Sequence, residues 1–137
     1  MRRRAQLKRY QRGSTLMEFA LILPAFLLLT VGVVDFGRGI WTYHTLSHAA
    51  REGARYAIVR GANSRHPASS SEIGEVVQSR TGGLDPQKLV VTASWDPDNK
   101  PGSAVQVRVQ YNFRPVTPLF SSETLVLSSR SQMVISQ

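Results

Sequence analysis

The chain has 137 residues, which is enough for one small domain with an extra segment and too few for a two-domain enzyme. Its 17 Lys and Arg residues against 9 Asp and Glu give a net charge of +8, which by itself would suggest a nucleic-acid partner. Six of these cations precede Gly13 with no acidic residue among them: Arg2, Arg3, Arg4, Lys8, Arg9 and Arg12. The basic charge therefore belongs to a tail, and we expect no nucleic-acid partner. The lack of cysteine excludes disulfides and thiolate metal sites.

An apolar segment follows this basic leader of residues 1–13. Between Ser14 and Val34 the only formal charge is Glu18, and roughly 20 such residues span the hydrocarbon core as a helix. We therefore expect residues 14–36 to cross a lipid bilayer. By the positive-inside tendency, the leader stays in the cytoplasm and the chain after Asp35 lies outside. This predicts a single-pass protein of the cytoplasmic (inner) membrane, with its N-terminus in and its C-terminus out.

Two other interpretations of the apolar segment stay open. A cleaved secretory signal also begins with cations, but its apolar stretch is usually only about 7–15 residues, and no convincing Ala-x-Ala follows Val34. The segment could also be a plain membrane anchor that is never processed, because such an anchor has the same composition.

Helical spacing continues beyond the apolar segment, so residues 37–61 are expected to extend the same helix outside the membrane. A helix from Ser14 to about Val59 would be roughly 70 Å long, although Gly37 and Gly39 could interrupt it. A stripe of small residues allows close helix packing, either against neighbouring subunits or against the protein's own sheet: Ala50, Gly53, Ala54 and Ala57.

The remainder of the chain predicts a short linker and a small α+β region. Residues 62–71 are rich in Gly, Pro and Ser, and Ser69 with Glu72 forms a capping-box pattern that opens a helix through about Arg80. Strand patterns follow at residues 89–95, 104–113 and 124–135. The predicted fold class is α+β, a long N-terminal helix packed on a small antiparallel sheet of about three strands.

The junction at Gly13 is the most specific feature of the sequence. A carboxylate inside the hydrocarbon costs roughly 2.5–3.5 kcal/mol, so Glu18 should have a partner there. Cleavage after Gly13 would create one, because the new amine of Ser14 lies one helical turn away. Alternatively, Glu18 sits at the level of the lipid headgroups and needs no partner.

Two blocks of this sequence resemble the TadE-like proteins, which are minor pilins or pseudopilins of the Tad (Flp) pilus. The first block runs from Gly13 through Glu18, Phe19 and Pro24, and the second is the sequence AAREGARYA at residues 49–57. The resemblance implies processing by a prepilin peptidase between Gly13 and Ser14. It also implies subunit docking by the first block, with the major pilin, other pseudopilins and an inner-membrane pilus assembly platform as partners.

The resemblance implies no catalysis and no cofactor, and the other candidate sites are weak. His44, His48 and Glu52 have plausible metal-ligand spacing but lack the His-Glu-x-x-His pattern, so a polar helix face with a contact between His48 and Glu52 is favoured. Asp96, Asp98 and Asn99 resemble part of a calcium loop without its later bidentate glutamate, and a turn explains them. We expect no metal.

The sequence thus predicts a non-enzymatic minor pilin or pseudopilin that is trimmed after Gly13. The competing hypothesis is an unprocessed single-pass anchor that displays a small extracytoplasmic binding module. The sequence leaves open whether the protein enters a filament at the cell surface or stays in the membrane.

Overall fold

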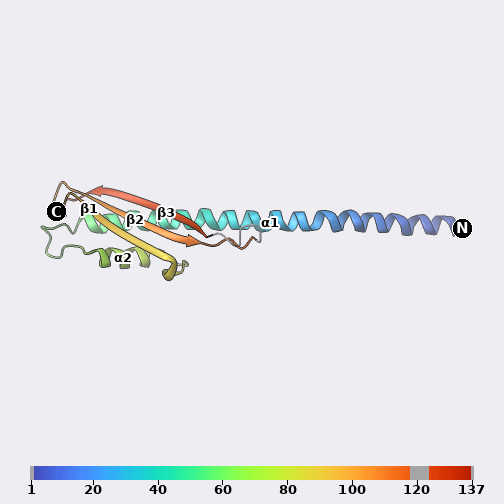
Figure 1. Cartoon of the computed structure of the whole chain (residues 1–137), viewed down its shortest axis with the longest axis horizontal. Coiled ribbons are helices and arrows are strands. Elements are labelled where there is room, and N and C mark those ends of the chain that lie inside the picture. The colour runs from blue at the N-terminus through green and yellow to red at the C-terminus, as the bar shows by residue number, and fades with distance from the viewer. Residues whose placement is uncertain (1, 118–123, 137) are drawn as a thin grey trace.

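A computed structural model of the chain describes the backbone of residues 2–117 and 124–136, and the side chains of residues 15–117 and 124–136. The predicted α+β class is confirmed: a long N-terminal helix packs on a three-stranded antiparallel sheet (Figure 1). The elements in chain order are α1 (Arg2–Ile58), α2 (Ser70–Ser79), the 3-10 turn η1 (Pro86–Lys88), β1 (Leu89–Asp96), β2 (Ala104–Phe113) and β3 (Leu125–Val134).

Helix α1 differs from its prediction at the N-terminal end. It begins at Arg2 rather than at Ser14, because the leader consists largely of good helix formers and extends a helix that is already nucleated downstream. It also runs without a break through Pro24, Gly37 and Gly39. Its 57 residues correspond to a rod about 85 Å long, and only its C-terminal part is covered by the rest of the chain (Figure 1).

The sheet has the strand order β1-β2-β3, with β2 in the centre. Alternation along β2 is as the sequence predicts, since Val105, Val107 and Val109 are fully buried while Arg108 is exposed. Strand β3 begins at Leu125 and ends at Val134, close to the predicted bounds. The buried face of the sheet is therefore the face that meets the helices.

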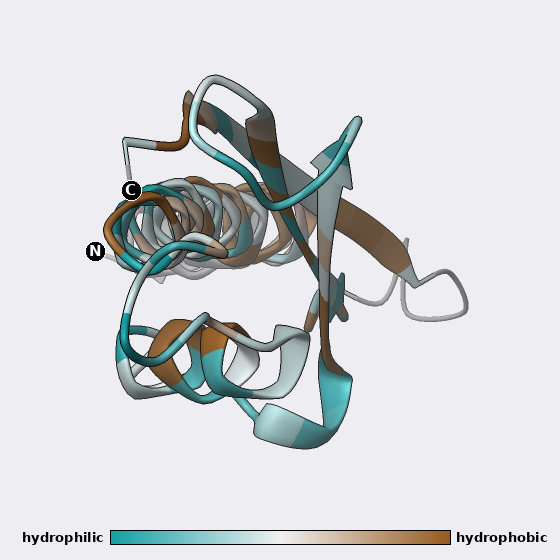
Figure 2. Ribbon diagram, turned by 90° about the vertical axis from the view of Figure 1, so that its left-hand side faces the viewer, coloured by the Kyte–Doolittle hydropathy of each residue, from teal (hydrophilic) through white to brown (hydrophobic). Residues whose placement is uncertain are grey.

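The core lies between two layers, because the C-terminal part of α1 and helix α2 lie side by side on one face of the sheet (Figure 2). Leu46 of α1 packs in one cluster with Ile73 and Val77 of α2 and with the valines of β2. All of these side chains are fully buried. The domain is thus built on the far end of α1, and the apolar segment of α1 lies outside it.

The predicted capping box at α2 is confirmed. The Ser69 hydroxyl accepts the Glu72 N–H at 3.3 Å, and the Glu72 carboxylate accepts the Ser69 N–H at 2.9 Å. The expected linker before α2 is tied to the turn between β1 and β2, since Ala62 N–H donates to the carbonyl of Asn99 at 2.6 Å. The connection is therefore part of the folded domain.

Candidate functional site

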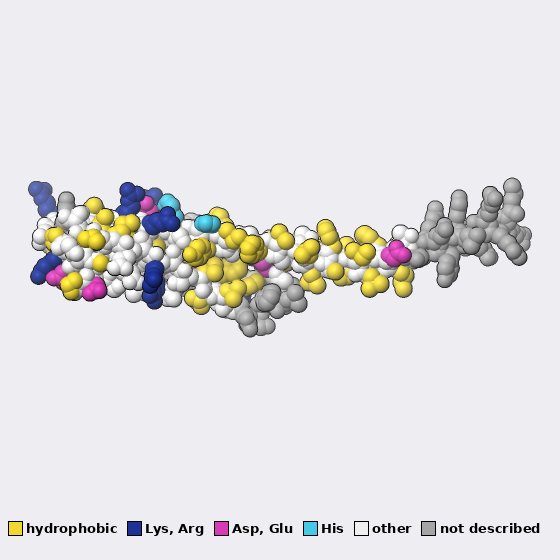
Figure 3. Space-filling model, turned by 90° about the horizontal axis from the view of Figure 1, so that it is seen from above, with side chains coloured by type: hydrophobic (Ala, Val, Ile, Leu, Met, Phe, Trp, Pro, Cys, Tyr) yellow, Lys and Arg dark blue, Asp and Glu magenta, His cyan; other side chains and the backbone are white. Residues whose placement is uncertain are grey.

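The apolar part of α1 presents its side chains outward on all sides. Bulky side chains between Leu16 and Val34 are exposed by up to 77%, the value at Leu21, and hydrophobic atoms cover the narrow rod in Figure 3. Each such side chain is stabilised by about 1.5–3 kcal/mol when it leaves water. Within the helix Thr15–Ile58, this segment is long and apolar enough to cross a membrane.

The predicted docking residues lie at the N-terminal end of this segment. Glu18 and Phe19 are exposed, and Pro24 lies inside the uninterrupted helix. Gly13 and Ser14 belong to the same helix, about one turn before Glu18, and the structure describes only their backbone. The predicted processing and docking residues therefore share one continuous stretch of α1.

The predicted small-residue stripe lies in the core at the other end of α1. The side chains of Ala50, Ala54 and Ala57 are fully buried, and they pack with α2 and the sheet of the same chain. A Cβ on Gly53 would meet Val77 Cγ2 at 2.7 Å, so only glycine allows α2 to approach this closely. At 1.5 Å per residue the stripe is about 50 Å from Glu18, and the two predicted sites do not meet.

A carboxylate that the sequence did not single out joins the apolar helix to the domain. Asp35, which is 7% exposed, accepts the backbone N–H groups of Val116 and Thr117 on one oxygen, Oδ2, at 2.8 and 2.6 Å. The Thr117 hydroxyl donates to the same oxygen. We call these contacts the Asp35 clamp. They hold the chain that follows β2 against α1 at the end of the apolar segment.

Arg38 completes the clamp from the next turn of α1. Its guanidinium Nη1 lies 3.0 Å from Asp35 Oδ1, and its Cζ lies 5.5 Å from the ring centroid of Phe113 at the end of β2. Both carboxylate oxygens of Asp35 therefore accept hydrogen bonds, as a buried carboxylate requires. No sequence pattern identifies this arrangement, because two of the donors are backbone groups.

An apolar groove runs along α1 on either side of the clamp. Its volume is about 1290 Å³, and we call it the α1–sheet groove. One wall comes from α1, from Ala25 up to His44, and the other comes from the end of β2, the chain after it and the start of β3. Leu28, Leu29 and Phe36 thus line the same groove as Leu125 and Leu127. The groove joins the apolar segment to the end of the sheet where β2 ends and β3 begins.

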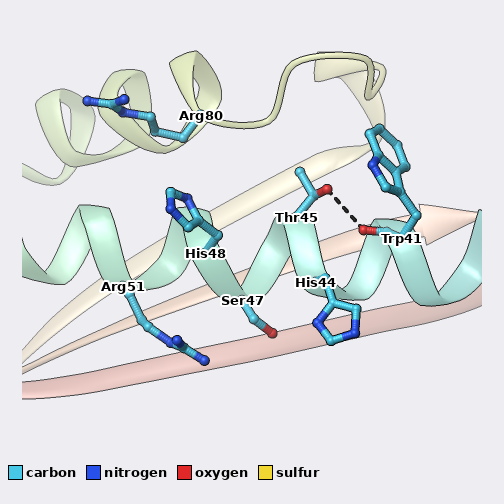
Figure 4. A pocket seen from close by; sticks show the side chains of 7 residues that line it. All are labelled: Trp41, His44, Thr45, Ser47, His48, Arg51 and Arg80. Carbon is cyan, nitrogen blue, oxygen red and sulfur yellow. Dashed lines mark hydrogen bonds between the residues drawn. The ribbon is translucent and has the colours of Figure 1, made fainter.

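The predicted polar face of α1 lines a second, smaller pocket of about 480 Å³ (Figure 4). His48 lies on the side of α1 that faces Arg80, whereas His44 and Arg51 point to the other side (Figure 4). Glu52 lies 3.8 Å from Arg55 rather than against His48, the contact that the sequence favoured. Among the described residues there is no group of three metal-ligating side chains.

The turn between β1 and β2 uses its acidic side chain for its own hydrogen bonds. Asp98 Oδ1 accepts the Ser103 hydroxyl at 2.6 Å and the Lys100 N–H at 3.1 Å. These contacts, the Ser103 hydroxyl first, lower the pKa of Asp98 below its usual range. These local hydrogen bonds show that Asp98 stabilises the turn itself.

Together these features define an α+β protein with a long exposed apolar helix and a small domain clamped to it. Comparison with known families gives one match: residues 13–55, less than a third of the chain, match the family model described as TadE-like protein. This match agrees with the resemblance inferred from the sequence, and that part of the chain is similar to a family associated with the Tad pilus. No curated protein and no solved structure matches the chain.

Proposed function

We propose that this protein is a minor pilin or pseudopilin that is held in the cytoplasmic membrane as a precursor, trimmed after Gly13, and used in assembling a Tad-type pilus. The observation that carries the proposal is the exposed apolar part of α1, which lies within the residues 13–55 that match the family model. A helix of this kind is stable either in a bilayer or among other apolar helices.

Glu18 gives a physical reason for α1 to move from the bilayer into a bundle of apolar helices. A carboxylate near the end of an apolar helix is stabilised wherever a cation lies next to it. Trimming after Gly13 removes six cations and leaves an amine on Ser14, one turn from Glu18. Loss of the charged leader lowers the cost of leaving the membrane, and the amine of the same or a neighbouring subunit pairs with Glu18.

The proposed partners follow from these steps. A prepilin peptidase acts on the Gly13–Ser14 bond, the major pilin and other pseudopilins dock along α1 near Glu18, Phe19 and Pro24, and an inner-membrane assembly platform receives the trimmed chain. Because Pro24 has no backbone N–H, one carbonyl of α1 lacks its usual hydrogen-bond donor. A neighbouring helix packed against α1 makes this missing bond tolerable. The protein itself carries out no reaction in this proposal.

A Gly13→Ala variant tests the proposal in cells that have an active prepilin peptidase. We expect the variant to keep its leader and remain in the membrane fraction, while the unmodified chain is trimmed. Gly37→Ala is a matched control, because a Cβ at Gly37 meets nothing within 4 Å and the residue is distant from the junction. Equal trimming of Gly13→Ala and Gly37→Ala would overturn the proposed processing.

The second candidate function is an unprocessed anchor that displays the α+β domain. The observation that favours it is the Asp35 clamp, which fixes the domain to the helix at the end of the apolar segment, as a permanent display module would need. The same variants separate the two functions. Under this alternative, the unmodified chain and Gly13→Ala both retain the leader, and their masses differ only by the methylene group that the substitution adds.

A further inference from the structure

The Asp35 clamp sets the depth of the sheet relative to a membrane. From Thr15 to Asp35 the helix rises about 30 Å, which is the thickness of a bilayer hydrocarbon core. If residues 15–34 fill that core, Asp35 lies at the interface nearer to the domain. Val116 and Thr117 lie at the same depth, because their N–H groups bond to Asp35 at 2.8 and 2.6 Å.

Several side chains near the Asp35 clamp are apolar and exposed. Val116 is 66% exposed, Leu125 is 48% exposed and Val126 is 59% exposed. We call these three residues the sheet tip. Exposed apolar side chains gathered at one place mark a contact surface. On the face of β3 that carries Val126, the next three side chains are polar: Ser128, Arg130 and Gln132.

The α1–sheet groove indicates that the sheet tip is surrounded by lipid. Toward the N-terminus of α1, the groove extends to Leu28 and Leu29, which lie several residues before Asp35 and therefore within the segment that would cross the membrane. This end of the groove is thus at the depth of the lipid acyl chains. Leu125, one of the three tip residues, lines the same groove.

Charged side chains near the tip fit the headgroup layer. Arg114 is exposed directly after β2, and the Arg38 side chain is 49% exposed although it bonds to Asp35. Arginines at this depth are attracted to anionic lipid phosphates. Phe36 and Trp41, 71% and 52% exposed, are aromatic residues of the kind that gather at a membrane interface.

We propose that the sheet tip inserts into the bilayer leaflet nearer to the domain, with phospholipid acyl chains packed in the α1–sheet groove. The domain is then held at two places, by α1 and by Val116, Leu125 and Val126, and cannot swing freely about the helix. This inference rests on the membrane-spanning part of the proposed function and is independent of the cleavage. Lipid is favoured over a second copy because the groove is continuous with the spanning segment.

Single-cysteine spin labelling tests the proposal on the full chain, which contains no cysteine of its own. Val126→Cys places a nitroxide at the tip. Val134→Cys is its matched control, because Val134 lies on the same face of β3, eight residues and about 26 Å farther on, and is 62% exposed. Leu28→Cys reports on the spanning segment. Each variant is reconstituted in phosphatidylcholine vesicles containing phosphatidylglycerol.

Collision rates of each nitroxide with oxygen and with a water-soluble nickel chelate give its depth. We expect the Val126 label to be several-fold less accessible to the chelate than the Val134 label, and more accessible to oxygen. Equal chelate access at both sites, with the Leu28 label shielded, overturns the tip insertion alone. A Leu28 label open to the chelate overturns the spanning placement as well.

A second copy in the groove would give a different result. Shielding of the Val126 label would then disappear when labelled protein is diluted with excess lipid, and dipolar broadening between labels would disappear with it. That outcome also overturns the proposal, since lipid contact is independent of protein concentration in the vesicle.

Discussion

Asp35 and Thr117 lie 82 residues apart in the chain, yet Asp35 Oδ2 accepts the Thr117 N–H at 2.6 Å. This contact joins the apolar helix to the segment that leaves β2. Because the carboxylate serves two N–H groups and a hydroxyl, its removal leaves several donors without an acceptor.

Replacement of this carboxylate should loosen the clamp locally. In Asp35→Ala we expect the amides of Val116 and Thr117 to exchange hydrogen roughly tenfold faster, since hydrogen bonds to charged groups are among the stronger ones. Asp96→Ala, at an exposed carboxylate at the end of β1, is the control. Unchanged exchange at Val116 and Thr117 in Asp35→Ala would show that the clamp does not hold this segment.

The close approach of α1 and α2 predicts opposite effects for two glycines. Gly53→Ala should destabilise the domain by about 1–3 kcal/mol, because its Cβ would meet Val77 Cγ2 at 2.7 Å. Gly74→Ala should stabilise it by about 0.5–1 kcal/mol, since Gly74 lies inside α2 and a Cβ there meets nothing within 4 Å. Urea unfolding of the full chain in detergent micelles measures both, and a neutral Gly53→Ala would contradict the packing described.

The capping box of α2 predicts a dependence of stability on pH. The hydrogen bond from the Ser69 backbone N–H, followed by that from the Ser69 hydroxyl, lowers the pKa of Glu72 below its usual value of 4.5. A lowered folded-state pKa means that this stabilisation is present above the unfolded pKa and is lost as the pH falls through the folded value. Glu72→Gln should therefore weaken the fall in unfolding free energy below about pH 4.5, relative to the unmodified chain. If the unfolding free energy depended on pH in the same way in Glu72→Gln and the unmodified chain, the capping box would not contribute to stability.

The strand register predicts a stabilising change on the exposed face of the sheet. Arg108 lies directly opposite Arg130, and like charges in this arrangement are destabilising. Arg130→Glu should stabilise the domain by about 0.2–1 kcal/mol at low salt, and the gain should disappear in high salt. Arg130→Gln, which only removes the repulsion, should give a smaller gain. Destabilisation by Arg130→Glu at low salt would contradict the register.

Local patterns in the sequence were sufficient for much of the fold. Alternation of Val105, Val107 and Val109 predicted the central strand and its buried face, and Ser69 with Glu72 predicted the start of α2. These patterns work because hydrophobic period and helix capping act over a few residues.

The remainder depends on contacts between distant segments. In the sequence, Asp35 is only the first charged residue after the apolar run. Its partners are backbone N–H groups 81 and 82 residues away, which carry no side-chain pattern. The small-residue stripe left two interpretations open, and only the position of α2 shows that Gly53 meets Val77 within the same chain. Helix α1 begins at Arg2 rather than at the predicted Ser14 because the residues of the basic leader also have good helix propensity.

The central claim is that α1 is an assembly element released by cleavage at the Gly13–Ser14 bond. The most direct test is the intact mass and N-terminal sequence of the protein extracted from membranes of cells with an active prepilin peptidase. We predict a chain that begins at Ser14 and lacks the six leader cations. A chain that still carries the complete basic leader in those cells would contradict the claim and leave the permanent anchor as the function.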